Sequence, residues 1–566
     1  MVSRSSDEKE LGHFPRMKAS YQTVLAFACS ALVGLALRSH DCFFVDGAPR
    51  CLTVYQNPTL LFHPNNHLLY LVNVFAWTRI AAALRFDLSD PLQFMVAVDT
   101  MNCLAAAVCV AVLFWILRKV TSSWKLATIV CIGYGLTTAF LAQAVNPNEP
   151  MVGSLWSFLG IAFAILSLNN RRLWPIVVCG VLFAFAMATY RSMVFLAPAA
   201  AVVIVSPLAT DESWNPLRRG QPLRLAVLGI SFALGCVLIF GWAYSHMGVA
   251  RADMLSKFLH QDDSRAYLDV SANQWLKLPL GLVRNCFPLL PLYNGMRGFL
   301  HGPKSVLLSM TALIVALWLC VFYCGYTLVK RRSSLTTIEL TAVVAAVAGL
   351  LVTMIPLLAW NPHYGKFWIQ PLACIAVLVA IAFRHFPEVS RQVLLVGRVA
   401  GVLFLGGVLF NLGWAFRNHR HLPFEFAEAR KVKQFVADKD LVILDRGSDS
   451  VSVMYAYLWA DEKQFFPIMD EATIHGEGIL GEIDTAIRNT RAAGGKVYFL
   501  GVVDLPKPTW DVFLDRRCGV PYTSFDRYRS AVQLKAQFTS RTGPTSLWEL
   551  GAPQQAQPPA MRAPHS

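Results

Sequence analysis

The fold that this sequence predicts is mainly α, a polytopic membrane bundle of about eleven spanning helices followed by a small C-terminal α/β domain. Composition gives the first indication, because 55% of the 566 residues are hydrophobic and only 15% are charged. Soluble domains usually carry about a quarter charged residues. The second indication is the repetition of apolar runs of about 20 residues, the length that crosses a bilayer as a helix.

The apolar runs define the expected spanning helices in order. They cover residues 20–38, 91–117, 126–145, 151–168, 173–189, 192–206, 224–246, 304–329, 337–358, 367–383 and 393–415. The two runs beside Tyr190 are short, which is typical of tilted or broken membrane helices. The first run follows a polar, basic segment and is long enough to stay in the membrane, so we expect no cleavable signal peptide.

Basic residues cluster in every second connection between these helices. The clusters are Arg4, Lys9, Arg16 and Lys18; Arg118, Lys119 and Lys125; Arg171 and Arg172; Arg218, Arg219 and Arg224; Lys330, Arg331 and Arg332; and Arg384 and Arg391. Cytoplasmic loops carry an excess of Lys and Arg, so the N-terminus is predicted to be cytoplasmic. The same distribution explains the net charge of +15 without a nucleic-acid partner.

The segment Leu68–Phe86 is apolar but is not predicted to cross. A crossing here would place every later basic cluster on the wrong side of the membrane. We therefore expect an amphipathic helix in the outer interface, with Asn66, Tyr70, Asn73 and Arg79 toward water. The alternative is an ordinary spanning helix with a snorkelling arginine.

The chain is expected to have four parts. Residues 1–19 form a cytoplasmic tail, and residues 20–415 form the membrane domain, with long outer loops at 39–90 and 247–303. The odd number of crossings places residues 416–551 outside as an α/β domain. There "DLVILDRG" and "KVYFLGVV" predict strands, "GEIDTAIRNTRAAGG" a helix and "TSLWEL" an edge strand. Residues 552–566 are rich in Pro, Gln and Ala and are predicted to be disordered.

Carboxylates, imidazoles and cations gather in the loops expected on the outer side. They are Asp41, Asp46, His63, Asn66 and His67 in the first long loop, Glu149 in "NPNEP", Arg191 in "TYRS", and His363 and Lys366 in "WNPHYGKF". Transfer from an anionic lipid carrier needs this combination. A carboxylate takes the proton of the attacking hydroxyl, and Arg or Lys stabilises charge on the departing phosphate. For each residue alone, a solvated loop charge is the alternative.

The pattern resembles the GT-C class of membrane glycosyltransferases, especially the group that includes protein mannosyltransferases and bacterial lipid-A sugar transferases. In that group a long outer loop carries an early acidic residue, then a His-Pro segment and an interfacial helix. Here "DGAPRCLTVYQNPTLLFHPNNHLLYLV" is similar to that loop. The stretch "NPNEPMVGSLWSFLGIAFAILSLNNRR" resembles the turn between the third and fourth helices, and "WNPHYGKFWIQPL" resembles a late loop before a Pro-containing helix.

The resemblance implies sugar transfer on the extracytoplasmic face from a polyprenyl-phosphate-linked donor to a glycan, lipid or protein acceptor. Asp46 would be the general base, with Asp41 as the alternative. His63 and His67, with Asn66, would position donor phosphate or acceptor, as would Glu149 and His363. Arg191 and Lys366 would bind the phosphate. Some members of this group use a divalent cation such as Mg²⁺ or Mn²⁺ and others do not, so a cofactor is left open.

Two other functions fit parts of the pattern. A secondary transporter would favour ionisable residues at the membrane midplane and an internal repeat. Asp99 is one such carboxylate, which is either functional or paired with a neighbouring helix, but we find no repeat. An outer-face polysaccharide polymerase or ligase would share the topology. Lack of an Asn-x-Ser/Thr sequon in the outer loops favours a bacterial inner membrane over a secretory compartment.

Overall fold

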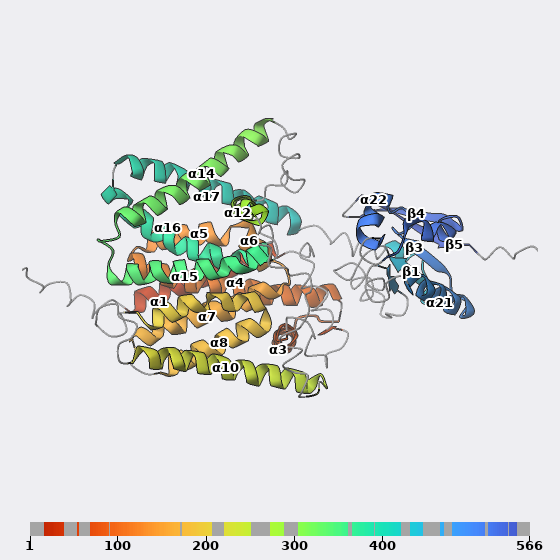
Figure 1. The fold of residues 1–566 in the computed structure, drawn as a ribbon, viewed down its shortest axis with the longest axis horizontal. Coiled ribbons are helices and arrows are strands. Elements are labelled where there is room, and N and C mark those ends of the chain that lie inside the picture. The colour runs from red at the N-terminus through yellow and green to blue at the C-terminus, as the bar shows by residue number, and fades with distance from the viewer. Residues whose placement is uncertain are drawn as a thin grey trace, which may run out of the picture. The chain divides into compact units, whose positions relative to one another are not determined.

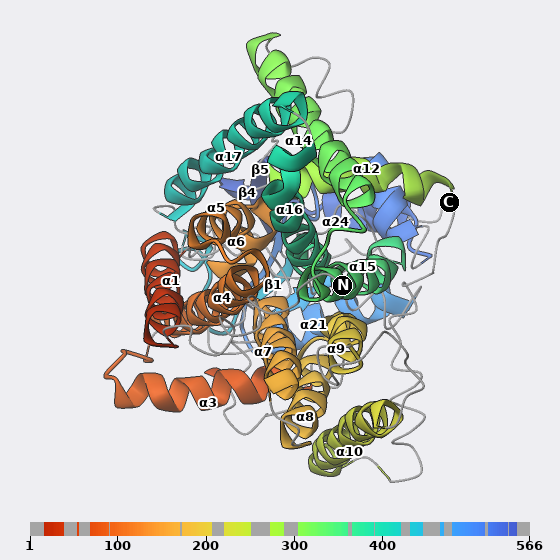
Figure 2. The same cartoon turned by 90° about the vertical axis from the view of Figure 1, so that its left-hand side faces the viewer.

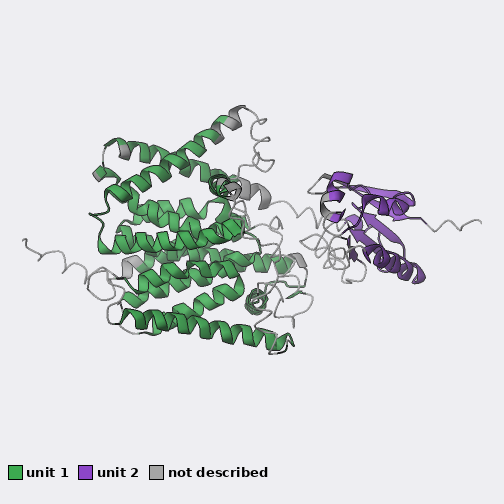
Figure 3. Ribbon diagram, viewed as in Figure 1, with its two compact units in different colours: residues 1–40, 53–420 green, residues 41–52, 421–566 purple. Residues whose placement is uncertain are grey.

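The computed structural model describes residues 16–38, 54–55, 68–89, 91–169, 173–206, 220–248, 250, 272–287, 304–359, 365–389, 391–419, 431–444, 465–468, 478–515, 519–540 and 543–551. The chain divides into two compact units (Figure 3). The larger unit takes residues 1–40 and 53–420, and the smaller unit takes residues 41–52 and 421–566.

The larger unit is helical (Figure 1). Its elements are α1 (Arg16–Leu37), α3 (Tyr70–Ala83), α4 (Pro91–Thr121), α5 (Trp124–Gly135), α6 (Thr138–Ala144), α7 (Glu149–Asn169), α8 (Trp174–Thr189), η2 (Arg191–Leu196), α9 (Ala197–Ile204), α10 (Gln221–His246), α12 (Ala272–Cys286), α14 (Lys304–Lys330), α15 (Thr337–Ala359), η5 (Gly365–Phe367), α16 (Ile369–Val389) and α17 (Arg391–His419).

Eight helices among the described residues are long and apolar enough to cross a membrane, or nine if the bent pair α5 and α6 counts as one span. The α5–α6 pair is bent by 74°, and α8 and the η2–α9 segment are shorter apolar helices. Each of the eleven predicted runs falls on helix, but three of them form these bent or short pieces. The chain is a multi-pass integral membrane protein with the predicted helical architecture.

The long helices lie side by side, and their connections alternate between two ends of the bundle (Figure 1). One end, here called the α3 end, carries α3, α6 and α12. Both α3 and α12 run across the long helices, as Figures 1 and 2 show from two directions. The prediction that the segment after the His-Pro pair does not cross is therefore confirmed, because α3 has only 14 residues and lies across the bundle.

The predicted facing of α3 is partly wrong. Tyr70 is fully buried, and Asn73 points into protein, where its Nδ2 donates to Thr189 Oγ1 of α8 at 3.4 Å. Arg79 is exposed as predicted, with its guanidinium 4.8 Å from the Phe75 ring centroid. The polar residues at the start of α3 therefore attach the helix to the bundle.

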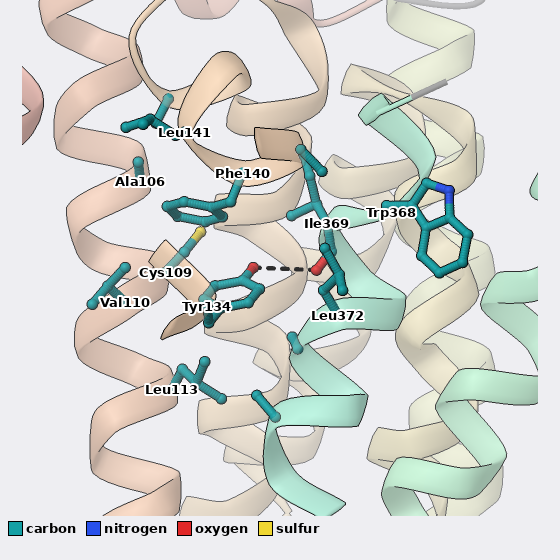
Figure 4. Packing of buried hydrophobic residues seen from close by; sticks show 14 of the residues in the cluster. Ala106, Cys109, Val110, Leu113, Tyr134, Phe140, Leu141, Trp368, Ile369 and Leu372 are labelled. Atoms are coloured by element: carbon teal, nitrogen blue, oxygen red, sulfur yellow. Dashed lines mark hydrogen bonds between the residues drawn. The ribbon is translucent and has the colours of Figure 1, made fainter. Parts of the chain in front are cut away.

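The core of the larger unit joins α4, α5, α6 and α16 (Figure 4). The Tyr134 hydroxyl at the end of α5 donates to the Ile369 carbonyl of α16 at 3.2 Å, and its ring lies 4.6 Å from that of Phe140 in α6. Leu113 of α4 and Leu372 of α16 pack in the same cluster. These contacts fix the bent α5–α6 pair against the helix that follows η5.

The smaller unit holds a five-stranded sheet in the order β2-β1-β3-β5-β4. Its elements are β1 (Leu441–Leu444), β2 (Phe465–Pro467), α21 (Ile479–Ala492), β3 (Val497–Leu500), α22 (Lys507–Trp510), η8 (Asp511–Asp515), η9 (Tyr522–Phe525), α24 (Asp526–Arg529), β4 (Val532–Ser540) and β5 (Gly543–Leu550). The strands β2, β1 and β3 are parallel, and β5 and β4 are antiparallel.

The α/β class predicted for this unit is confirmed, with one correction. The strand containing "TSLWEL" is not an edge strand, because β5 pairs with β3 on one side and β4 on the other. The β4 strand, "VQLKAQFTS", occupies that edge and was not predicted. Alternation places Ile443 against α21 residues such as Ile483, and Val442 against Val436 on the opposite face.

Candidate functional site at the α3 end

Three of the predicted site residues lie in the described part of the chain: Glu149, Arg191 and Lys366. The remaining ones lie outside the described residues: Asp41, Asp46, His63, Asn66, His67 and His363. The site is therefore built below from the three described residues and the elements that hold them.

Arg191 stands at a break between two short helices. Tyr190 adopts an extended backbone (φ −155°, ψ 110°), which ends α8 and starts the 3₁₀ helix η2. The Met193 carbonyl in η2 accepts from Ser157 Oγ of α7 at 2.6 Å and from Gln370 Nε2 of α16 at 2.7 Å. Two neighbouring helices therefore fix the break, and with it the start of η2.

Lys366 is brought to the same break by η5. Its Nζ lies 5.8 Å from the centroid of the Tyr190 ring, and the Tyr190 and Phe367 rings are 6.3 Å apart. Tyr190 is buried, so the aromatic contact is made inside the protein. A Lys beside an aromatic face gains cation–π attraction. Of the two predicted phosphate-binding cations, Lys366 thus contacts Tyr190 and Arg191 follows Tyr190 in sequence.

Glu149 is the first residue of α7 and is fully buried. Gly153 follows one turn later on the same helical face. A Cβ atom at Gly153 would lie 2.8 Å from Met193 Cγ and 3.0 Å from Tyr190 Cβ. Helix α7 therefore packs closely against the break between α8 and η2. Glu149 therefore continues the face that packs on Tyr190. A carboxylate at a helix N-terminus is also favoured by the helix dipole.

The first turn of α3 is attached to the end of α8. The Leu69 N–H donates to the Ala188 carbonyl at 3.0 Å, and Leu68 and Leu69 are buried. Ala188 is three residues before Arg191 in sequence. His67 directly precedes Leu68 in the sequence, and the predicted His-Pro cluster lies outside the described residues.

Two buried asparagines that sequence reasoning missed hold the neighbourhood of Lys366. Asn411 of α17 donates to the carbonyls of Leu136, at the α5–α6 bend, and of Cys286, at the end of α12, the latter at 2.9 Å. Asn285 of α12 faces η5, since a Cβ atom at Gly365 would lie 3.0 Å from Asn285 Oδ1. Leu278 and Leu282, four residues apart, are a sequence signal for α12.

The described residues thus bring a carboxylate and two cations to the α3 end of the bundle. Glu149, Arg191 and Lys366 lie in α7, η2 and η5. Lys366 contacts Tyr190, Arg191 follows Tyr190 in sequence, and α7 packs on Tyr190 one turn after Glu149. Such a group can bind a phosphate through its cations and a hydroxyl through its carboxylate. Within the described ranges, no group of three or more His, Cys, Asp or Glu side chains is placed to hold a metal ion.

The described residues define a polytopic, mainly helical membrane protein with a small C-terminal α/β unit, the fold class that the sequence predicted. Solved structures of ArnT from Cupriavidus metallidurans are similar to this chain. The apo structure matches with a TM-score of 0.56 and 12% identity, covering 95% of this chain and 100% of that one. The structure bound to undecaprenyl phosphate matches with a TM-score of 0.53 and 10% identity, covering 94% and 99%.

At that identity the similarity establishes the shared fold alone. No protein-family model matches the sequence, and no curated protein matches it.

Proposed function

We propose that this protein is a membrane glycosyltransferase that moves a sugar from a polyprenyl-phosphate-linked donor to an acceptor hydroxyl on the extracytoplasmic face. The observation that carries the proposal is the contact of Lys366 with Tyr190, directly before Arg191, at one end of a fold that resembles ArnT over nearly its whole length. One of the ArnT structures holds undecaprenyl phosphate, an anionic lipid carrier of the proposed class.

The proposed reaction is one displacement at the anomeric carbon. Asp46, or Asp41 in its place, removes the proton of the acceptor hydroxyl, and the oxygen forms a bond to the anomeric carbon. The bond from that carbon to the phosphate oxygen breaks, and the polyprenyl phosphate leaves with the electron pair. Arg191 and Lys366 stabilise its negative charge, while Glu149 binds the acceptor or donor sugar through its hydroxyls. His63, Asn66, His67 and His363 complete the proposed substrate-binding set.

The proposed orientation follows the basic clusters. Residues 20–415 form the membrane domain, with the N-terminal tail 1–19 in the cytoplasm and the α/β domain 416–551 outside. The α3 end of the bundle then faces the extracytoplasmic side. A flipped lipid-linked donor would present its sugar phosphate at that level, with its chain in the bilayer.

The test is transfer by the purified full-length protein in lipid nanodiscs, given a panel of polyprenyl-phosphate sugars and lipid, glycan and peptide acceptors. We expect a product whose mass is raised by one sugar, together with free polyprenyl phosphate. One of the two variants Asp46→Asn and Asp41→Asn, the one that removes the general base, is expected to lower kcat about 10²- to 10⁴-fold. Unchanged turnover in both variants would remove the proposed base, and absence of transfer with every donor would reject the proposal.

A matched control is available on the same side of the bundle. Asp87, between α3 and α4, accepts hydrogen bonds from the Ser89 hydroxyl at 2.6 Å and the Ser89 N–H at 3.0 Å. These two bonds lower the pKa of Asp87 and engage it in its own turn. Asp87→Asn is therefore expected to keep wild-type turnover, so that loss of charge alone does not explain a loss of activity.

A further inference from the structure

Three segments that carry residues of the proposed site are joined at Met193. Met193 lies in η2, two residues after Arg191, and is buried. Its carbonyl accepts from Ser157 Oγ of α7 at 2.6 Å and from Gln370 Nε2 of α16 at 2.7 Å. Gln370 Nε2 also donates to Ser157 Oγ at 3.2 Å. Ser157, Met193 and Gln370 are here called the Met193 junction.

The Met193 junction consists of polar groups in apolar surroundings. Ser157 is fully buried and Gln370 is 2% exposed, and both stand in helices that are long and apolar enough to cross a membrane. Polar groups there are unfavourable unless they have partners or serve a function. The amide nitrogen of Gln370 makes two bonds, and the Met193 carbonyl accepts two. A network satisfied in this way holds its members in one arrangement.

Gln370 is connected to Lys366 by a short, ordered stretch of chain. It follows Lys366 by four residues, at the passage from η5 into α16. The Trp368 N–H donates to the Gly365 carbonyl at 3.0 Å, and the Leu372 N–H donates to the Trp368 carbonyl at 2.9 Å. Trp368 is also buried. The backbone at Lys366 is therefore held in a fixed relation to Gln370.

The contact between Lys366 and Tyr190 does not by itself fix the spacing of the two cations. It joins the Lys366 Nζ to the Tyr190 ring at 5.8 Å, and a lysine ammonium stands on a flexible four-carbon stem. The bond from Gln370 reaches the backbone of η2 instead, two residues after Arg191. It therefore links the two stretches of backbone from which Arg191 and Lys366 extend.

We propose that Gln370 is a positioning residue that, together with Ser157, sets the separation of Arg191 and Lys366 so that both cations bind the same carrier phosphate. This inference deepens the proposed function and rests on it for the roles of the two cations. Gln370 touches no substrate in this proposal. It acts through the Met193 carbonyl, because binding groups must be held in place by the residues behind them.

The first experiment measures the link without any ligand, by hydrogen–deuterium exchange in the full-length protein. Gln370→Leu has a similar size and removes both donors. Exchange at the amides of Met193 and Trp368 is expected to rise about tenfold, since both segments lose their common bond. The control is Gln221→Leu at the opposite end, where Gln221 Nε2 donates to the Val205 carbonyl at 2.9 Å. It should raise exchange near Val205 alone.

Unchanged exchange at Met193 and Trp368 in Gln370→Leu would overturn the link.

Ser157→Ala is a milder second variant, because the Met193 carbonyl keeps one donor. Exchange at Met193 is expected to rise about threefold. Its matched control is Ser154→Ala, one turn earlier on α7, since Ser154 Oγ reaches Met193 only through Sδ, at 3.1 Å, and a thioether is a weak acceptor. Equal changes in the two serine variants would overturn the role of the Met193 carbonyl.

The second experiment separates positioning from general loss of structure, by a double-mutant cycle on the Kd for undecaprenyl phosphate. Gln370→Leu is expected to raise Kd about 3- to 10-fold, and Lys366→Ala at least about tenfold. Adding Gln370→Leu to Lys366→Ala should raise Kd less than about twofold further, because the second cation is already gone. Gln221→Leu should leave Kd at the wild-type value. Independent, multiplicative effects of Gln370→Leu and Lys366→Ala would overturn the positioning role.

The two experiments fail separately. Wild-type protein that shows the expected exchange pattern but binds no undecaprenyl phosphate would reject the proposed function and leave the link through Met193 standing. Wild-type protein that binds the lipid, with multiplicative effects in the cycle, would keep the carrier-phosphate site and reject Gln370 as its positioning residue.

Discussion

Replacing Asn411 by leucine tests how the bundle supports the loop that carries Lys366. Asn411 Nδ2 donates to the Leu136 carbonyl at the α5–α6 bend and to the Cys286 carbonyl in the last turn of α12. The last carbonyls of a helix have no donor within the helix, and a bend frees others in the same way. Asn411→Leu fits a similar volume and removes both bonds, so two buried carbonyls lose their donor.

The size of the effect follows from those two carbonyls. Side-chain hydrogen bonds inside membrane proteins average about 0.6 kcal/mol, but a buried acceptor left unsatisfied costs about 1–3 kcal/mol. Two such acceptors give a loss of about 2–6 kcal/mol in the free energy of unfolding. The loosened end of α12 also carries Asn285, which faces Gly365 next to Lys366. We therefore expect a higher KM for the lipid donor as well.

The assay is thermal unfolding of the purified protein in detergent, followed by donor titration in nanodiscs. The control is Gln221→Leu, which removes a single bond to a buried carbonyl at the opposite end. It should cost about half as much stability and leave KM unchanged. An Asn411→Leu protein with the stability of the wild type would refute the reasoning, because two buried carbonyls without a donor must lower the free energy of unfolding.

Two further outcomes follow from the packing and from the pKa of Tyr498. A Cβ atom at Gly397 would overlap the ring of the buried Phe386, so Gly397→Ala should lower stability by about 1–3 kcal/mol in thermal unfolding. At Gly406 no atom lies within 4 Å of an added Cβ, so Gly406→Ala should be neutral or slightly stabilising. Burial, with two nearby carboxylates, raises the pKa of Tyr498 to about 12. Its unfolded pKa is about 10, so the smaller unit should keep this contribution below pH 10 and lose it between pH 10 and 12. Denaturant unfolding of the full chain, followed by circular dichroism, should show a smaller loss in Tyr498→Phe than in the wild type, because burial also raises the pKa of Tyr528 in the same unit.

The sequence was most informative about the membrane-spanning helices, because the bilayer restricts their length and composition. A helix that crosses lipid must be long and apolar, so the long spans could be located within a few residues. The distribution of basic clusters argued against a crossing at residues 68–86, and α3 lies across the bundle. The shortened spans around Tyr190 were also visible, because their apolar runs are brief. These predictions needed only local composition and charge.

The contacts that shape the site could not be predicted in the same way. Asn102, Gln370 and Asn411 bind backbone carbonyls far away in sequence, and an isolated polar residue in an apolar run does not indicate its partner. The α12 helix escaped notice because it contains Pro279 within a mixed polar stretch of a long loop. The predicted exposure of Tyr70 was wrong because residue type says nothing of the neighbouring helix that covers it.

The most direct test of the account is binding of undecaprenyl phosphate, measured by native mass spectrometry of the full-length protein. The account predicts one bound lipid, with affinity reduced at least tenfold by Lys366→Ala and unchanged by Lys125→Ala, a cation that stacks on Trp124 at the opposite end. Equal affinity in wild type and both variants, or no bound lipid at all, would contradict a carrier-phosphate site at the α3 end.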